Sequence, residues 1–234
     1  MSDLKLPKQA QVVIIGGGVI GCSVAYHLTK LGWSDVLLLE RKELTCGTTW
    51  HAAGLVGQLR ATRNMTMLAQ YTSELFAGLE VETGQATGFK QNGSISVAPD
   101  QERFEELKRG ASMAKCFGLE VEVISAREAL ELHPYLNIDD LCGAVFLPKD
   151  GQTNPIDTTR ALAQGARMGG AQILENVLVQ GILREKDKVS GVVTDQGEVK
   201  AEYVVNCAGL WGRQVGKMAG VNVPLHASEH FYIV

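Results

Sequence analysis

At 234 residues, the chain can form one large domain or two closely joined ones. Hydrophobic residues make up 45% and charged residues 21% of it, a balance typical of a folded globular protein and not of a disordered chain. The formal net charge of −4, without a clustered basic stretch, argues against nucleic acid and anionic membrane as partners, and no apolar run approaches the roughly 20 residues of a membrane span.

The cysteines and the start of the chain give an expectation about location. The five cysteines are scattered, with no CxxC pair. This pattern fits a reducing cytoplasm and gives no sign of a disulfide framework or a metal site. The first ten residues lack the apolar core of a secretory signal, and they are too short and too poor in arginine for a mitochondrial presequence. We therefore expect a cytoplasmic protein without a metal.

The chain begins with a strand, helix and strand pattern. Gln11–Ile15 is a short apolar run rich in β-branched residues, as expected of a buried strand. Val19–Leu31 has helical spacing and ends at Gly32, and Val36–Leu39 is a second buried strand. The apolar side of the helix is predicted to carry Ile20, Val24, Leu28 and Leu31. These elements predict a βαβ unit, and hence a parallel sheet with a right-handed crossover.

The middle of the chain has the pattern of a different domain. Asn64–Glu82 and Asp100–Phe117 are predicted helices, and Phe89–Val97 contains the Asn-Gly turn signal of a hairpin. Residues 125–128 read Ser-Ala-Arg-Glu, a capping box that opens a short helix. We interpret residues 89–147 as a mainly antiparallel domain inserted into the nucleotide-binding one.

Alternating helix and strand patterns return after residue 150. Asp157–Met168 is a predicted helix, and strands are expected near Ile173 and at Val177–Leu183. A hairpin around Val189–Val199 precedes the buried strand Tyr203–Cys207. This part is therefore predicted to continue the first domain.

The chain ends on an apolar strand pattern. Glu229–Val234 has no turn or polar tail behind it, and an unpaired apolar strand end favours aggregation. We interpret the chain as cut in mid-fold, with residues 223–234 beginning a strand that returns to the inserted domain.

The glycine-rich turn after the first strand is a candidate binding site. Gly16 permits a tight turn, Gly18 lets a pyrophosphate approach the helix N-terminus, and Gly21 lets helix and sheet pack closely. Glu40 ends the second strand, where its carboxylate can accept hydrogen bonds from ribose hydroxyls and would repel a 2′-phosphate. The pattern disfavours NADP and does not separate FAD from NAD.

The order of later segments favours FAD. Val204–Gly209 is a buried strand that runs into small residues and then Trp211. It resembles the late strand and turn of two-domain flavoproteins, where the backbone lies close to FAD. Asp150-Gly151, followed by Pro155 and the helix Asp157–Met168, resembles the segment that such proteins place before that strand. Each segment alone could be an ordinary turn, but their joint order favours a flavoprotein.

The segment Gly47–Leu55 carries the most specific resemblance. It sets Trp50 and His51 among small residues shortly after the second strand, and Gln58-Leu59-Arg60 follows. With the segments above, it resembles the flavin-attachment segment of the sarcosine dehydrogenase and dimethylglycine dehydrogenase family of D-amino acid oxidase-like flavoproteins. In that family the histidine matching His51 is bonded through a ring nitrogen to the flavin 8α-methyl carbon.

The resemblance implies an α/β fold and a set of site residues. Residues 1–88 and 148–222 would form a Rossmann-like FAD-binding domain with a parallel sheet. The inserted, mainly antiparallel substrate domain would contain residues 89–147, and residues 223–234 would return to it. The residues expected to bind FAD are Gly16, Gly18, Gly21, Glu40, Arg41, Thr48, Thr49, His51, Gly54, Leu55, Val179, Ala208, Gly209 and Trp211.

The resemblance also implies a reaction. An N-methylated glycine, sarcosine or dimethylglycine, would be oxidised at the C–H bond beside its nitrogen by hydride transfer to covalently bound FAD. The iminium would yield formaldehyde, or a one-carbon unit on tetrahydrofolate through a domain outside this chain. Electrons would pass to oxygen or to an electron-transfer flavoprotein. His230 matches a histidine near flavin and substrate and is the expected catalytic residue, a solvent-facing strand histidine being the alternative.

Two other functions fit most of these patterns. One is a D-amino acid oxidase-like flavoenzyme that holds FAD without a covalent bond, against which His51 argues. The other is a non-catalytic regulatory subunit that resembles the family and lacks its Trp-His pair, whereas this chain has Trp50 and His51. The sequence does not choose between sarcosine and dimethylglycine, because one methyl group changes binding by only about 1–3 kcal/mol in an apolar pocket.

Overall fold

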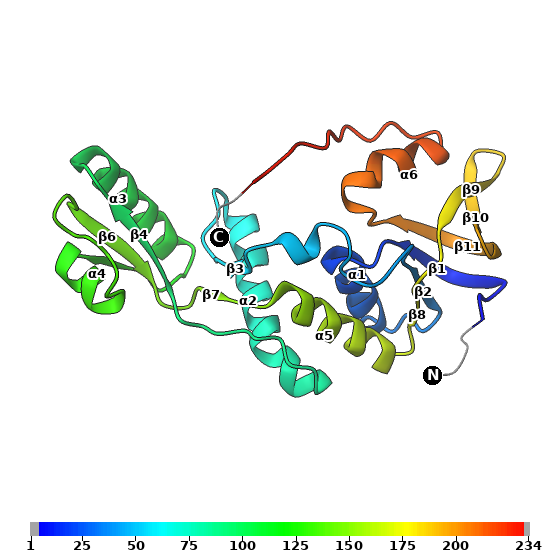
Figure 1. The fold of residues 1–234 in the computed structure, drawn as a ribbon, viewed down its shortest axis with the longest axis horizontal. Coiled ribbons are helices and arrows are strands. Elements are labelled where there is room, and N and C mark those ends of the chain that lie inside the picture. The colour runs from blue at the N-terminus through cyan, green and yellow to red at the C-terminus, as the bar shows by residue number, and fades with distance from the viewer. Residues whose placement is uncertain (1–4, 232–234) are drawn as a thin grey trace. The chain divides into compact units, whose positions relative to one another are not determined.

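The computed structural model describes residues 5–231, which fold into two units (Figure 1). Within the described residues, the first unit comprises 5–53, 79–87 and 155–231, and the second comprises 54–78 and 88–154. The predicted division into a nucleotide-binding domain with an inserted domain differs from these units at residues 54–78, 88, 148–154 and 223–231. Residues 223–231 belong to the first unit and do not return to the inserted domain. The other residues belong to the second unit, where β3 (Leu55–Val56) pairs antiparallel with β7 (Gly151–Gln152).

The first unit is built on a six-stranded sheet in the order β8-β2-β1-β11-β10-β9. The first four strands of this order are parallel, β10 pairs antiparallel with β11, and β9 pairs antiparallel with β10. The strands are β1 (Gln9–Ile15), β2 (Val36–Leu39), β8 (Gln172–Leu174), β9 (Val179–Glu185), β10 (Lys188–Thr194) and β11 (Gly197–Asn206). The predicted βαβ unit and mixed α/β class are confirmed. The second arm of the predicted hairpin and the predicted strand Tyr203–Cys207 are joined in the single strand β11, which ends at Asn206.

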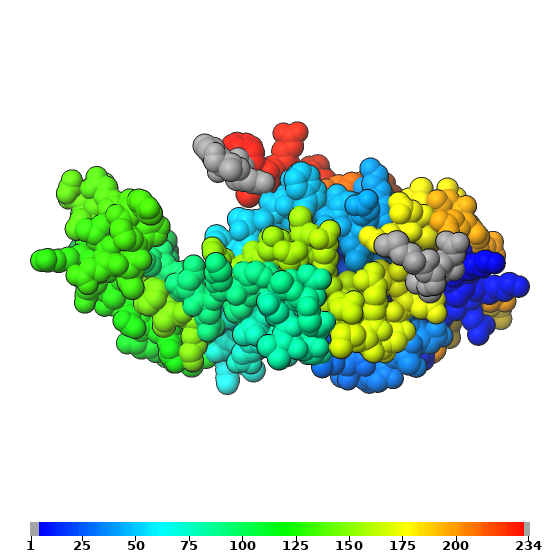
Figure 2. All heavy atoms as spheres, turned by 60° about the horizontal axis from the view of Figure 1, so that its bottom comes forward, coloured from blue at the N-terminus to red at the C-terminus, as the bar shows by residue number. Residues whose placement is uncertain are grey.

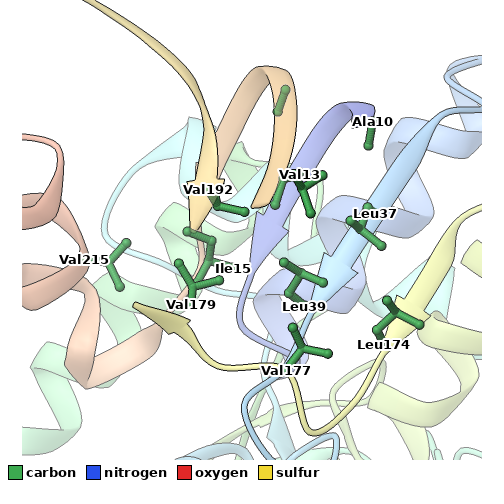
Figure 3. Packing of buried hydrophobic residues seen from close by; sticks show 12 residues of the cluster. Ala10, Val13, Ile15, Leu37, Leu39, Leu174, Val177, Val179, Val192 and Val215 are labelled. Carbon is green, nitrogen blue, oxygen red and sulfur yellow. The ribbon is translucent and has the colours of Figure 1, made fainter. Parts of the chain in front are cut away.

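Burial on both faces explains why the central strands are uninterrupted apolar runs. All four residues of β2 are at most 2% exposed, as expected of parallel strands covered on both sides. Figure 3 shows one of these faces, where Val13, Leu37 and Leu39 lie in a single apolar cluster with side chains of neighbouring strands. Val215 of α6 (Gly212–Met218) belongs to the same cluster. The core thus fixes the strand ends at which the glycine turn begins.

The helix α1 (Val19–Lys30) packs on a different face from the one predicted. Its buried residues are Gly21, Cys22, Ala25 and Tyr26, whereas Ile20 is 63% and Leu31 76% exposed. Small side chains are needed because α1 packs closely on α5 (Pro155–Met168), where a Cβ at Gly165 would lie 2.7 Å from the Tyr26 ring. In Figure 2 yellow atoms from around residues 170–180 lie beside blue atoms from the start of the chain, in line with the pairing of β8 with β2.

The second unit contains a three-stranded antiparallel sheet in the order β4-β6-β5. These strands are Ser94–Ala98, Gly143–Leu147 and Glu122–Ile124, respectively. The helices of this part are α2 (Arg63–Thr83, whose last residues belong to the first unit), α3 (Gln101–Cys116) and α4 (Ala126–Leu132). Successive residues of β6 face opposite ways: Val145 clusters with residues of α3, and Ala144 with Ala129 of α4. The predicted capping box of α4 is present at Ser125 and Glu128.

Two predicted elements are wrong in the described residues. Phe89–Val97 is not a hairpin: Lys90 pairs with Gln152, and β4 pairs with β6. Residues 221–231 contain no helix or strand, although a strand was predicted from Glu229. A strand requires a hydrogen-bonded neighbour, and within residues 5–231 this segment pairs with none. The remainder of that predicted strand, 232–234, lies outside the described residues.

Candidate FAD site

A cavity of about 220 Å³ lies at the carboxyl ends of the parallel strands of the first unit. This edge of a doubly wound sheet is where ligands bind, beside the turn that leads into the first helix. The volume is below the roughly 300–1,000 Å³ of sites for drug-sized ligands, so it suits part of a dinucleotide. The predicted residues that line it are Gly16, Gly18, Glu40, Arg41, Thr48, Thr49, Val179, Ala208, Gly209 and Trp211.

Two glycines of the turn, Gly16 and Gly21, lie so close to backbone atoms that an added Cβ would overlap them. Gly16 has a φ of +111°, and a Cβ there would lie 2.4 Å from the carbonyl oxygen of Cys207. A Cβ at Gly21 would lie 1.9 Å from the carbonyl oxygen of Gly16. Gly21 does not line the cavity, so its part in the site is to let α1 pack against the turn. Gly18 lines the cavity at the helix N-terminus, where backbone N–H groups and the helix dipole favour an anion.

The Glu40 carboxylate is buried at the end of β2, with 8% of the residue exposed. Its Oε2 accepts a hydrogen bond from the N–H of Gly17 at 2.7 Å. Its Oε1 accepts one from the N–H of Lys42 at 3.0 Å and one from the thiol of Cys46 at 3.4 Å. An ionised carboxylate offers about four lone-pair sites, so capacity remains for a ribose hydroxyl. A 2′-phosphate would meet a buried negative charge.

Thr48 and Thr49 bring the loop after β2 to the start of α1. The side-chain oxygen of Thr49 accepts a hydrogen bond from the N–H of Val19 at 3.0 Å. The N-cap residue of α1 is Gly18, which has no side chain to do this. Thr49 therefore joins the loop to the glycine turn, and both threonines line the cavity.

Arg41 and Trp211 form a stacked pair on the cavity wall. The guanidinium carbon of Arg41 lies 3.9 Å from the centroid of the Trp211 ring, a cation–π contact worth about 0.5–1 kcal/mol when exposed. Trp211 ends η2 (Gly209–Trp211), which begins three residues after the last residue of β11. Arg41 adds a positive charge to a cavity that also contains the N-terminus of α1. Both features attract a negatively charged group such as a pyrophosphate.

Besides Gly21, four predicted site residues do not line this cavity. His51, in η1 (Thr49–His51), is exposed, and its ring centroid lies 3.7 Å from that of Trp50. Gly54 and Leu55 belong to the second unit, where the carbonyl of Gly54 accepts a hydrogen bond from the N–H of Thr153 at 2.8 Å. His230 is exposed, in a segment without regular structure.

Several cavity residues were not predicted from the sequence. They include Ile15, Cys46, Val177, Gln214, Val215 and Met218. Val177 is brought there because its N–H bonds the carbonyl of Glu40 at 2.9 Å, a non-local contact. The spacing of Val215 and Met218 on α6, three residues apart, is a helical signal that could have indicated this wall.

In the part of the chain that the structure describes, no group of three or more His, Cys, Asp or Glu side chains is arranged to hold a metal ion. Between residues 5 and 231, no helix has both the length and the apolar character needed to span a membrane.

Comparisons with known proteins agree with the geometry of this cavity. Residues 11–234 match the family model described as DAO, FAD dependent oxidoreductase. The chain is 46% identical to human mitochondrial sarcosine dehydrogenase and 42% identical to rat mitochondrial dimethylglycine dehydrogenase, covering 98% and 97% of this chain and 26% of each relative. It is 43% identical to the mouse pyruvate dehydrogenase phosphatase regulatory subunit, over 99% of this chain and 27% of that protein.

A solved structure supports the same assignment. L-proline dehydrogenase from P. horikoshii superposes with a TM-score of 0.87 at 31% identity, covering 92% of this chain and 57% of that one. The chain spans about a quarter of the length of the curated relatives it matches. On the family match and this structural likeness, the chain belongs to the DAO family of FAD-dependent oxidoreductases.

Proposed function

We propose that this chain holds FAD for the oxidation of an N-methylated glycine, sarcosine or dimethylglycine. The observation that carries the proposal is the combination, in one cavity, of a glycine turn without room for side chains and a buried carboxylate at the end of β2. The relatives named as sarcosine and dimethylglycine dehydrogenases support the substrate class.

The described residues fit the ADP half of FAD. The start of α1 at Gly18 would face the pyrophosphate, and Arg41 would add a positive charge beside it. Glu40 would accept a hydrogen bond from the adenosine ribose. When bound, FAD would supply the redox chemistry by accepting a hydride equivalent from the C–H bond beside the substrate nitrogen. The oxidised substrate would then release formaldehyde to water or pass its one-carbon unit to a folate.

We propose His51 as the covalent attachment point of the flavin. It follows Thr48 and Thr49, which line the cavity, and its exposure leaves the imidazole accessible to a cofactor that extends from there. The Trp50 ring lies beside it, with ring centroids 3.7 Å apart and planes tilted by 35°. His230 is proposed as the group that helps set the protonation of the substrate amine, and oxygen or an electron-transfer flavoprotein as the electron acceptor.

Acid denaturation tests the attachment. The chain and its His51→Ala variant would be expressed, denatured in acid and washed, and flavin fluorescence would be measured in the protein band. His226→Ala replaces another exposed histidine and is the matched control. We expect fluorescence in the chain and in the control, and none in His51→Ala.

The other outcomes point to other functions. Complete release of flavin from a folded, yellow protein would contradict the covalent bond and favour a non-covalent flavoenzyme. A folded protein that never acquires flavin would favour a regulatory role, as the name of the 43% identical mouse relative suggests for that protein. Turnover of sarcosine and dimethylglycine, with oxygen consumption and formaldehyde as readouts, would be measured on the longest polypeptide that contains the chain.

A further inference from the structure

The loop that follows β2 is fastened to the glycine turn just before Cys46. Thr45 is buried, and its N–H donates a hydrogen bond to the carbonyl of Gly17 at 3.0 Å. Its φ is +72°, a left-handed conformation that is rare for a β-branched residue and persists only where the surroundings impose it. With Thr49 bonded to Val19, the loop is held on both sides of Cys46. The position of its thiol is therefore set by the backbone.

The Cys46 thiol meets the carboxylate that faces the cavity. The thiol is half-buried on the cavity wall and donates a hydrogen bond to Oε1 of Glu40, with an S–O distance of 3.4 Å. Burial, and then the negative charge and hydrogen bond of Glu40, raise the pKa of the thiol. Cys46 thus keeps its proton at neutral pH and remains a hydrogen-bond donor.

We propose that Cys46 is a positioning residue that holds the Glu40 carboxylate in the orientation needed to bind the adenosine ribose. The inference rests on the proposed placement of FAD. Three donors fasten the carboxylate: the N–H groups of Gly17 and Lys42 and the thiol of Cys46. The two N–H groups are backbone atoms, so the thiol is the donor among these three that substitution can remove. Without it, Oε1 keeps one donor and the carboxylate can turn away from the ribose.

A comparison of two ligands tests this role. The probes are ADP and 2′,3′-dideoxy-ADP, which differ only in the ribose hydroxyls, and binding is measured by isothermal titration calorimetry. All proteins carry His51→Ala, so that any flavin can be removed before titration. Cys46→Ala and Cys46→Val remove the proton, Cys46→Ser retains a donor, and Cys116→Ala, at an exposed cysteine outside the cavity, is the control.

We expect Cys46→Ala and Cys46→Val to weaken ADP binding about three- to tenfold, the effect of losing one hydrogen bond. Their affinity for the dideoxy ligand should change less than twofold, and Cys46→Ser should bind ADP nearly as the parent does. Glu40→Gln should remove the preference for ADP over the dideoxy ligand. Cys46→Ala and Cys46→Val differ in side-chain size. If one of them fails to fold, ADP binding by the other still tests the role of the thiol.

The results that would overturn the inference are distinct from those that would overturn the proposed function. Equal weakening of both ligands would mean that Cys46 only packs the cavity wall, and unchanged ADP binding would mean that the thiol has no role. Either result leaves the FAD site standing. A folded parent that does not bind ADP would overturn the site itself, and this inference with it.

Discussion

The two glycines Gly16 and Gly21 are constrained by separate contacts within one turn. Gly16 requires a positive φ, whereas Gly21 lies where a methyl group would overlap the carbonyl oxygen of Gly16. The turn therefore constrains the sequence through backbone packing as well as through the ligand. Substitution at Gly21 tests the packing part alone, because Gly21 does not line the cavity.

Gly21→Ala should destabilise the chain by about 2 kcal/mol or more, the range of overpacking in a tight interior. Urea unfolding of the flavin-free chain would measure it. The control is Gly78→Ala in α2, where no atom lies within 4 Å of the added methyl. That change should be neutral or stabilise by about 0.5–1 kcal/mol, because glycine disfavours helix interiors. Equal stability of Gly21→Ala and the parent would contradict the close packing.

Cys22 should resist alkylation. Burial raises the pKa of this thiol to about 12, so at pH 8 almost none of it is thiolate, the reactive form. Cys116 and Cys142 are exposed. Iodoacetamide treatment of the folded chain at pH 8, followed by peptide mass spectrometry, should modify these two and leave Cys22 unmodified. Rapid modification of Cys22 would contradict its burial in α1.

The raised pKa of Cys22 also predicts how the stability of the chain changes at high pH. The folded-state pKa of Cys22 lies above its ordinary value of 9.0, so the protonated thiol contributes stability below pH 9. That contribution is lost as pH rises from 9 to about 12. The free energy of unfolding of the chain should therefore fall more steeply over this range than that of Cys22→Ala. Parallel pH profiles for the two proteins would contradict the shift.

At the scale of elements, the end of α2 is tied to α1 by a carboxylate. Glu82 accepts a hydrogen bond from the hydroxyl of Tyr26 at 2.8 Å and pairs with Lys30 at 2.7 Å. The hydrogen bond from Lys30, and then that from Tyr26, lower the pKa of Glu82. A lowered carboxyl pKa contributes stability above the ordinary value of 4.5, and this is lost as pH falls.

Glu82→Gln should therefore reduce the free energy of unfolding at pH 7 and much less at pH 3. The reduction should be no more than about 0.5 kcal/mol, because both partners are partly exposed and solvent screens the pair. Urea unfolding at pH 7, 5 and 3 would measure it. Glu74→Gln, at an exposed position of α2, should change little at any pH. A constant difference across the three pH values would contradict the ionic origin.

The sequence predicted those elements whose determinants are local. β2 and the second half of β1 are continuous apolar runs because both of their faces are buried, and the α4 capping box consists of four consecutive residues. The buried face of α1 was mispredicted because close packing on α5 selects small residues, which hydrophobic periodicity does not recognise. Strand partners were mispredicted where they are distant in sequence, as for Lys90 with Gln152.

The same distinction applies to the candidate site. The glycine turn, Glu40 and Thr49 could be predicted because short motifs describe them. Val177 and Met218 could not, because only the packing of the sheet and of α6 brings them to the cavity. The structure gives His51 and His230 no place in the cavity lining, so their roles remain predictions from the family resemblance.

At the scale of the whole molecule, the chain crosses between its two units four times, at residues 53/54, 78/79, 87/88 and 154/155. Each unit has its own sheet and its own apolar clusters. All residues that line the candidate FAD cavity belong to the first unit. A ligand in this cavity should therefore stabilise the first unit by mass action, through contacts made within it.

Hydrogen exchange measured by mass spectrometry would test this. With FAD at about 100 times its dissociation constant, binding should raise the free energy of unfolding of the first unit by about 2.7 kcal/mol. Amides at 16–20, 46–49 and 208–211 should exchange more slowly, since they belong to the cavity lining or its immediate neighbours. Amides of β4 and β6 should keep their rates, because they belong to the other unit. Glu40→Gln should weaken the protection at the same FAD concentration. Equal protection of β4 and β6 would instead mean that the flavin couples the two units into one cooperative structure.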